Sequence, residues 1–424
     1  ALTQRIQELE KENARLKEIL EKNGIEYESF ESKTCNFNHI EATSVSICQF
    51  TLQEKVTIFQ SVFRGRDDVF AKRWYSSTTQ KSGYQPVCTR EWNQEFCDKR
   101  KYKCADCPNR QFAPLTYNDV FNHLAGKDVW GRDVIGLYPI RKDNTCCFLC
   151  TDFDDKSCEH GYKNDVLSFV NVCKTWNVPC YIERSRSGNG AHAWIFFDTP
   201  ITAFKARKLG NVILTEAMNS DVHLSFKSYD RFFPNQDTLP EGGLGNLVAL
   251  PLQGMARRKG NSVFVDEDFN AYADQWELLS QIRKLSEVEL DMLLRQHIEP
   301  TLGELSKTSE EKPWETPKMD MVQTDCYPKE IVLTRANMLY IPLTSLSAKC
   351  VNVFKRMAAF RNPEFYEKQG MRLSTYNIPR IISCSEITDD YLVLPRGCED
   401  AVRDILTQHN VKVMISDKTN HGHS

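Results

Sequence analysis

The amino-acid sequence predicts a mixed α/β or α+β protein made of two or three domains. Its 424 residues exceed the size at which one hydrophobic core usually stops growing. Between about residues 133 and 270, apolar runs typical of strands alternate with longer runs typical of helices, as in an α/β or α+β core. Hydrophobic residues make up 41% and charged residues 26%, which is ordinary for a globular protein.

The predicted elements divide the chain into a central domain, a linker and a small third module. A polar stretch at 301–328, with K-T-S-E-E-K-P at 307–313, predicts the linker between a domain at 24–300 and an α/β module at 329–424. The predicted strands are 134–139, 146–152, 180–184, 191–197, 246–252, 262–265, 380–384, 391–394 and 412–415. The predicted helices are 52–63, 164–177, 203–219, segments of 274–297, and 398–409.

The first 23 residues carry the heptad pattern of a coiled coil. Apolar residues recur at alternating spacings of four and three, at Leu2, Ile6, Leu9, Leu16 and Leu20. Asn13 falls at an a position, which favours a parallel homodimer of fixed register, and Gly24 ends the pattern. The alternative is a solvated helix that packs on its own chain.

Several function classes are excluded by what the sequence lacks. No apolar run of about 18 residues predicts a membrane span, and no Walker-type phosphate loop occurs. The charged N-terminus is unlike a secretory signal, so we expect a cytoplasmic protein whose 16 cysteines stay reduced. The net charge of −3 means that any contact with nucleic acid must use local basic patches.

Four cysteines at 88–107 predict a structural zinc knuckle. Cys104 and Cys107 form a C-x-x-C, and Cys88 and Cys97 complete the four thiolates of a tetrahedral site. An iron–sulfur cluster or unliganded cysteines are the alternatives. A basic rim that suits phosphate surrounds the knuckle, formed by Lys99, Arg100, Lys101, Lys103 and Arg110.

A basic and aromatic segment at 63–74 is a candidate contact for a single-stranded template. Arg64, Arg66, Lys72 and Arg73 alternate with aromatic residues there, and arginine for phosphate with a ring for base stacking is what such a contact needs. A solvated charged face with aromatics in the core is the competing interpretation.

Two carboxylates at the end of an apolar strand form the first catalytic candidate. Asp152 and Asp154 stand two residues apart, so on a strand they point to the same face. They can hold one or two Mg²⁺ or Mn²⁺ ions, which prefer oxygen ligands and assist phosphoryl transfer. Nucleases, glycosyltransferases and ordinary strand ends show the same D-x-D.

A glycine-containing loop at 184–192 is the second candidate, for an anionic triphosphate. Gly188 and Gly190 let the backbone approach a phosphate, and Ser187 and His192 add donors. Arg184 and Arg186 add fixed positive charge. The alternative is a hairpin turn with a buried histidine.

A third element follows at 226–237. It offers Asp230 as a further carboxylate, with Asp237 as a rival, and Arg257 of the later R-R-K adds a cation for nucleotide.

These motifs in this order resemble the three signatures of the archaeo-eukaryotic primase superfamily. The wider pattern is similar to the primase of TOTE conflict systems, which are associated with mobile elements. The similar segments are F-R-G-R-x-D-V-F at 63–70, K-C-A-D-C-P-N-R at 103–110, S-R-S-G-N-G-A-H-A-W at 185–194, F-P-N-Q-D at 233–237 and N-L-V-A-L-P-L-Q at 246–253.

The resemblance implies a primase fold, with an RRM-like sheet bearing the site and an N-terminal α/β unit. It implies Asp152, Asp154 and Asp230 as metal ligands and Ser187 and His192 as phosphate binders. Many relatives place the serine six residues before the histidine. Ser187 is five before His192, so Ser185 or Arg186 could share the role.

The tail also resembles a segment that joins such primases to a superfamily 2 helicase, through M-R-L-S-T at 371–375 and L-P-R-G-C at 394–398. The leading hypothesis is therefore a template-dependent primase-polymerase that uses nucleoside triphosphates on single-stranded DNA, with a fused or separate helicase. The alternatives are a zinc-stabilised nucleic-acid-binding adaptor that recruits a helicase, or a metal-dependent nuclease.

Overall fold

A computed structural model describes Arg15, Lys22, and residues 50–102, 107–154, 161–224, 231–297, 327–373, 375 and 378–420. The chain divides into two compact units, Ala1–Ile47 and Cys48–Ser424. Arg15 and Lys22 are helical and exposed, but the coiled coil predicted for residues 1–23 otherwise lies outside the described residues, as does most of the predicted linker. None of the helices described is long and apolar enough to cross a membrane.

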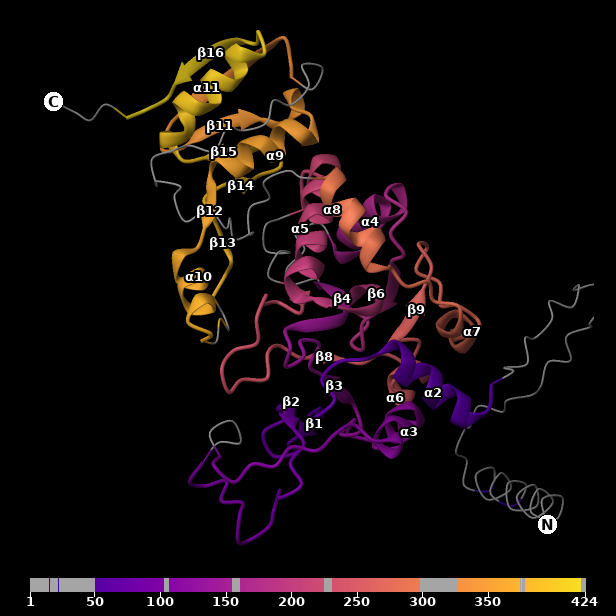
Figure 1. Cartoon of the computed structure of the whole chain (residues 1–424). Coiled ribbons are helices and arrows are strands. Elements are labelled where there is room, and N and C mark those ends of the chain that lie inside the picture. Colours follow the sequence, from indigo (N-terminus) through magenta and orange to yellow (C-terminus); the bar gives the residue numbers. More distant parts are fainter. Residues whose placement is uncertain are drawn as a thin grey trace, which may run out of the picture. The chain divides into compact units, whose positions relative to one another are not determined.

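A five-stranded antiparallel sheet forms the centre of the second unit (Figure 1). Its chain order is β4 (Thr145–Asp154), α4 (Tyr162–Thr175), β5 (Tyr181–Arg184), β6 (Gly190–Thr202), α5 (Ala203–Ser220) and β7 (Phe232–Phe233), with β9 (Val263–Val265) added later. The strands lie in the order β7-β4-β6-β5-β9. Strands β4, β5, β6 and β7, with helices α4 and α5 between them, thus form a β-α-β-β-α-β unit with ferredoxin-like strand order. This order matches the RRM-like sheet that the resemblance implied.

The two faces of this sheet are covered differently. Phe153 packs its ring 5.9 Å from Phe169 of α4, and a Cβ on Gly210 of α5 would lie 2.9 Å from Leu149, so odd-numbered residues of β4 face the helices. Phe148 lies on the other face, with its ring 5.2 Å from Trp194. Because side chains alternate along a strand, Asp152 and Asp154 share the face of Phe148, away from α4 and α5.

A second, four-stranded antiparallel sheet has the order β2-β1-β3-β8. Its strands are β1 (Ala71–Tyr75), β2 (Ser82–Pro86), β3 (Ile135–Leu137) and β8 (Val248–Ala249). Beside it lie α2 (Leu52–Val62), α3 (Tyr117–Ala125) and α6 (Gly254–Arg258). Helix α7 (Gln275–Ser280) contacts α2, and α8 (Glu287–Gln296) packs on α5 and β6 of the central sheet. A capping box between Thr51 and Glu54 fixes the start of α2.

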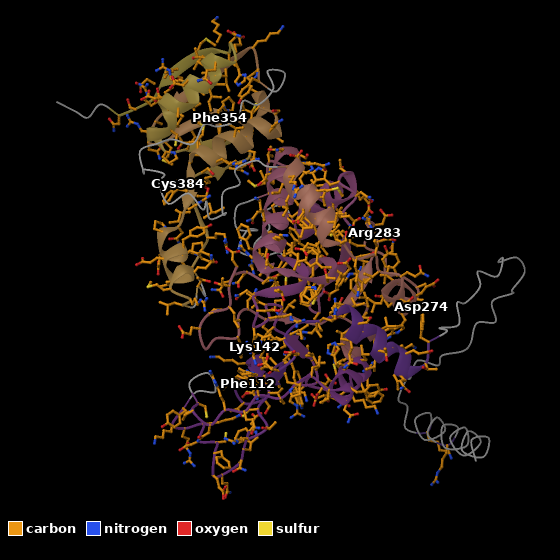
Figure 2. The ribbon with its side chains drawn as sticks, in the orientation of Figure 1. Phe112, Lys142, Asp274, Arg283, Phe354 and Cys384 are labelled. Carbon is orange, nitrogen blue, oxygen red and sulfur yellow. The ribbon has the colours of Figure 1, made fainter. Side chains whose placement is uncertain are left out.

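The C-terminal segment forms a third sheet with the order β14-β15-β11-β10-β16 and its own apolar core, in which Phe354 is buried (Figure 2). Its elements are β10 (Glu330–Arg335), β11 (Leu339–Pro342), α9 (Ala348–Met357), β14 (Glu386–Ile387), β15 (Tyr391–Leu394), α11 (Glu399–Gln408) and β16 (Lys412–Asp417). A hairpin of β12 (Ala359–Arg361) and β13 (Ile381–Ser383) flanks α10 (Pro363–Gly370).

Polar contacts join the C-terminal segment to the central sheet's helix α5. Asn352 donates to the Thr215 carbonyl at 3.3 Å, and the Lys355 ammonium donates to the carbonyls of Val222 and Leu224. Both α9 side chains are almost fully buried. The two parts therefore share an interface that is hydrogen-bonded as well as apolar.

Candidate active site

Four polar side chains form a row across the face of the central sheet that is turned away from α4 and α5. Asp152 of β4 stands directly opposite His192 of β6, which in turn stands opposite Glu183 of β5. Asp154 lies two residues further along β4, opposite Gly190. Since directly opposed residues on neighbouring strands have Cβ atoms about 5 Å apart, the register alone brings these groups together.

His192 is held between two carboxylates. Its Nδ1 lies 2.6 Å from the Glu183 Oε2, and its Nε2 lies 3.5 Å from the Asp152 Oδ1. Burial disfavours the charged ring, but the charge and hydrogen bond of Glu183, together with the charges of Asp152 and Asp154, raise the pKa of His192 to about 9. At neutral pH the imidazole is therefore protonated and can donate from both nitrogens.

Glu183 is a residue of this row that the sequence analysis did not identify. Its side chain is almost completely buried, and it also accepts a hydrogen bond from the Trp194 indole at 3.2 Å. Strand alternation could have found it. Glu183 is one residue from Arg184 on β5, so its side chain takes the face opposite to that of Arg184, which is the face of His192. The buried carboxylate fixes the orientation of His192.

Arg231 is the second functional candidate missed by the sequence analysis. One guanidinium nitrogen lies 3.5 Å from the Asp152 Oδ2 and another lies 3.5 Å from the Asp154 Oδ2. The Arg231 carbonyl accepts a hydrogen bond from the Asp152 amide at 3.0 Å, which places the residue beside β4. Its charge partly offsets the repulsion between the two carboxylates.

The loop between β5 and β6 borders the row. Ser185 donates its amide to the Gly190 carbonyl, and Gly188 has a positive φ of 86°, a backbone conformation that side chains other than glycine rarely adopt. The Ser187 hydroxyl is exposed and accepts a hydrogen bond from the Asn189 amide at 3.3 Å. This exposed loop places a hydroxyl close to His192.

The predicted basic residues around this loop take different positions. Arg184 donates to the main-chain carbonyls of Gly260 and Phe269, so its guanidinium ties β5 to the neighbouring loop. Arg186 is exposed in the loop itself. Arg257 lies on α6, and the segment that follows α6 meets the loop where Ser262 donates its amide to the Ser185 carbonyl.

The residues predicted to contact nucleic acid do not form one surface. Arg66 is buried and makes a bidentate ion pair with Asp68, which also binds Lys142 (Figure 2). Arg64 donates to the Asp198 carbonyl, six residues along β6 from His192. Lys72 is paired with Asp119 at 2.6 Å.

Of the remaining two, Lys101 lies in the cysteine-containing segment, with its ammonium 5.3 Å from the Tyr102 ring. Arg73 of β1 stands opposite Tyr84 of β2, and Tyr84 makes a hydrogen bond with Arg186 of the loop between β5 and β6.

The cysteine-containing segment is only partly described. Cys88, Cys97 and Cys107 are partly buried free thiols, and Cys104 lies outside the described residues. The Cys88 sulfur accepts a hydrogen bond from the Gln111 amide at 3.3 Å. Within the described part of the chain, no three histidine, cysteine or acidic side chains are grouped so that they could hold a metal ion.

The two candidates for the third carboxylate also separate. Asp230 lies outside the described residues, immediately before Arg231. Asp237 is nearly buried and pairs with Arg207 of α5, and it accepts a hydrogen bond from Gln369 at 3.0 Å. Because α5 covers the face opposite Asp152, this contact directs Asp237 toward the helical side of the sheet.

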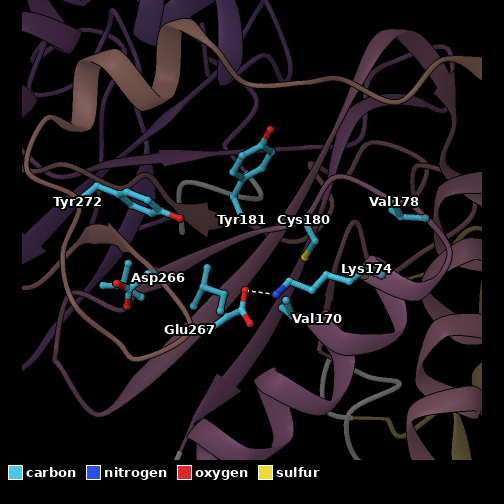
Figure 3. A pocket seen from close by; sticks show the side chains of 11 residues that line it. Val170, Lys174, Val178, Cys180, Tyr181, Asp266, Glu267 and Tyr272 are labelled. Carbon is cyan, nitrogen blue, oxygen red and sulfur yellow. Dashed lines mark ion pairs between the residues drawn. The ribbon is translucent and has the colours of Figure 1, made fainter.

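A small hollow of about 70 Å³ lies elsewhere, between α4 and the edge of the sheet (Figure 3). Lys174 and Glu267 form an ion pair in its wall. None of the residues predicted for the active site lines it.

Comparison with known proteins decides the family. Residues 54–293, more than half of the chain, match the family described as "TOTE conflict system, Archaeo-Eukaryotic Primase domain". The chain belongs to this family. No curated protein sequence matches it. Among solved structures, it is similar to the polymerase domain of Mycobacterium tuberculosis ligase D in complex with DNA, at 11% identity and a TM-score of 0.31, over 58% of this chain and 86% of that one.

Membership of the archaeo-eukaryotic primase family supports a nucleotidyl-transfer function of primase type. The donor set at Asp152 and Asp154 fits the divalent cation that such chemistry uses, because carboxylate oxygens are the ligands that Mg²⁺ and Mn²⁺ prefer. Both carboxylates are partly exposed, and the 3.5 Å contacts from Arg231 are longer than a charge-assisted hydrogen bond of about 2.8 Å. The two carboxylates are therefore accessible from solvent.

Proposed function

We propose that the chain is a template-dependent primase-polymerase that extends a strand on single-stranded DNA, within a mobile-element conflict or defence system. The observation that carries the proposal is the row of Asp152, His192 and Glu183, with Asp154 beside it, on the sheet face turned away from α4 and α5 in an archaeo-eukaryotic primase domain. A terminal 3′-hydroxyl attacks the α-phosphate of the incoming nucleotide. The new O–P bond replaces the bond to the β-phosphate, and pyrophosphate leaves.

The residues of the row divide this work. Asp152 and Asp154, with Asp230 as the proposed third carboxylate, hold Mg²⁺ or Mn²⁺. When bound, these ions supply charge neutralisation for the attacking and leaving oxygens. His192, charged at neutral pH, donates from Nε2 to the triphosphate, and the exposed Ser187 hydroxyl adds a second donor. Gly188 and Gly190 keep the backbone accessible, and Arg186 stands at the edge of the triphosphate site.

A nucleotide-incorporation assay tests the proposal. The full chain is incubated with a single-stranded DNA template, with and without a primer, in separate pools of ribonucleotides and deoxyribonucleotides with Mg²⁺ or Mn²⁺. We expect metal-dependent extension that an Asp152→Ala/Asp154→Ala double variant lacks. Full activity in the double variant would overturn the proposal. Degradation of the labelled strand without nucleotides would indicate a nuclease instead, and neither activity would favour the adaptor.

We also propose that Cys88, Cys97, Cys104 and Cys107 bind one structural zinc ion. This rests on the C-x-x-C spacing of Cys104 and Cys107 and on the thiolate preference of zinc. Elemental analysis of protein purified without chelator should find about one zinc ion per chain. Finding neither zinc nor iron would refute the site.

Two partners follow from the sequence patterns. The heptads of residues 1–23 support a parallel homodimer, which light scattering on the full chain and on a chain lacking residues 1–23 would reveal as a loss of mass. The tail's resemblance supports a fused or separate superfamily 2 helicase, which the module at 329–424 would adjoin.

A further inference from the structure

One face of β1 carries an arginine and a tyrosine. Arg73 and Tyr75 lie two residues apart and therefore share a face, and Tyr84 of β2 stands directly opposite Arg73. Trp74, between them, takes the other face, where it contacts Gly83. The second sheet thus presents one guanidinium and two phenol rings on one side.

An aromatic stack continues this face. The rings of Tyr75 and Trp130 are nearly parallel, 11° apart, with centroids separated by 4.8 Å. Arg73 braces the stack, since it donates to the Trp130 carbonyl at 2.6 Å and its guanidinium carbon lies 5.9 Å from the Tyr75 ring. Despite the stack, Trp130 remains 47% exposed. A large, fixed aromatic surface is therefore available to a flat apolar group.

Two positive charges meet beside this stack. Arg186 of the loop between β5 and β6 reaches this face, because it makes a hydrogen bond with Tyr84, which stands directly opposite Arg73. Burial raises the pKa of Tyr84, while the charge and hydrogen bond of Arg186 oppose that rise. The carboxylate of Asp128, whose charge also acts on Arg73, already accepts two hydrogen bonds at Oδ2, from Nε and one terminal nitrogen of Arg132. An anion between the two arginines would relieve their repulsion.

We propose that Arg73, Tyr75, Trp130 and Arg186 bind the unpaired DNA strand as it passes the active site, with a base on the Trp130 ring and a phosphate between the arginines. This inference rests on the proposed function, because it assigns a strand-binding surface to the same site. Base stacking on an aromatic ring is tolerant of sequence, which suits a template that must present every base in turn. Arg186 stands between this surface and the proposed triphosphate site.

Trp130→Ala tests the stacking. Binding of the full chain to fluorescently labelled oligodeoxythymidylate is measured by anisotropy, without metal or nucleotide. We expect about a tenfold loss of affinity, within the range for one base stacked on an aromatic ring. Trp130→Phe should retain most of the affinity, because it keeps a ring. Trp74→Ala is the matched control, since Trp74 is similarly exposed but lies on the opposite face of β1.

Arg73→Gln tests the phosphate contact by a second route. Losing one phosphate contact should reduce the slope of log K against log salt by about 0.7, the value for one contact to a single strand. Equal affinities for Trp130→Ala, Trp74→Ala and the wild type, with an unchanged salt slope in Arg73→Gln, would overturn the inference. The inference would also fail if these variants raised the KM for nucleotide and left the affinity for the strand unchanged. That result would mean that the surface binds the triphosphate.

These binding measurements are independent of catalysis. If Asp152→Ala kept full incorporation activity, the proposed function would fail while the strand-binding result stood. If strand binding ignored Trp130 and Arg73 while Asp152→Ala abolished incorporation, only the further inference would fail.

Discussion

Two clusters of aspartates and arginines differ sharply in their surroundings. In the open cluster, so called because its carboxylates are partly exposed, Asp152 and Asp154 each lie 3.5 Å from a nitrogen of Arg231. Asp237 lies under α5, nearly buried, paired with Arg207 and hydrogen-bonded to Gln369. Burial raises the pKa of Asp237, but the charges of Arg207 and Arg380 and the Gln369 hydrogen bond outweigh it and lower that pKa.

This difference in burial and pairing distinguishes a candidate ligand-binding site from a cluster that holds two segments of the chain together. Arg207 and Arg380 are almost fully buried, and Arg380 also donates to the Asn235 carbonyl at 2.8 Å. Gln236 donates to Thr375 at 3.0 Å. The F-P-N-Q-D segment at 233–237 therefore contacts the C-terminal segment. Partly exposed carboxylates can bind a ligand, whereas removing one partner of a buried ion pair leaves an uncompensated charge and destabilises the fold.

The largest expected effect concerns the open cluster. Asp152→Ala should lower metal-dependent nucleotide incorporation by at least about a thousandfold, because charge neutralisation by bound metal contributes several kcal/mol to such a transfer. Its free energy of unfolding should change by no more than about 1 kcal/mol, since the side chain is partly exposed. Single-turnover extension and urea unfolding measure the two quantities. If Asp152→Ala lowered the free energy of unfolding but kept its incorporation activity, Asp152 would have a structural role and the comparison would be wrong.

The buried cluster should respond in the opposite way. Asp237→Ala leaves the buried Arg207 guanidinium without its carboxylate, so it should cost about 3–5 kcal/mol of unfolding free energy. Nucleotide incorporation per folded molecule should remain. Asp152→Ala serves as the matched control in the same urea titrations. Abolished incorporation with an unchanged unfolding midpoint would make Asp237, rather than Asp230, the third carboxylate.

Much of the central fold was predictable because its signals are local. The strand predicted at 391–394 coincides with β15, and the helix predicted at 203–219 agrees with α5 to within one residue. The strand predicted at 246–252 was too long. Only Val248–Ala249 pair, because Leu252 has a positive φ of 64° and Pro251 lacks an amide donor. Strands β1 and β2 were not predicted. They contain many charged and polar residues, whose preference for a strand depends on their cross-strand partners.

The site was predictable where strand alternation applies and unpredictable where partners are distant. The D-x-D spacing alone placed Asp152 and Asp154 on one face. Nothing local to Lys72 shows that Asp119 neutralises it. Likewise, the pairing of Asp237 joins residues 30 and 132 positions apart in the chain. Charge in a sequence indicates a possible contact, and only the fold decides which contact forms.

Glu183 shares features of both clusters. It is buried like Asp237, but it contacts His192, which lies beside Asp152. Glu183→Gln keeps the volume and an acceptor for Trp194 but removes the charge. It should reduce kcat about 10- to 100-fold, the usual range for a residue that orients a ligand-binding histidine, with a raised KM for nucleotide. Steady-state kinetics separate this from a structural effect, which would lower the active fraction and leave KM unchanged.

The smallest effect comes from a second histidine, which sharpens the comparison between buried and open polar groups. His123 of α3 is fully buried, with Nε2 2.8 Å from the Pro251 carbonyl and Nδ1 accepting the Ile135 amide at 3.1 Å. Nδ1 must therefore stay unprotonated. Burial is the main cause that lowers the pKa of His123 to about 4, against about 6.5 when unfolded.

Because the folded state binds this proton less readily than the unfolded state, stability falls as pH drops below 6.5 and continues to fall until about pH 4. From pH 7 to pH 5.5 the loss should be about 1 kcal/mol. His123→Gln cannot take up the proton, so urea unfolding of both proteins should show their stability difference narrowing by that amount, while all other titrating groups cancel. If the stability difference between the two proteins did not change with pH, His123 would accept a proton in the folded state. Its buried site would then tolerate a charged imidazole as well as that of His192.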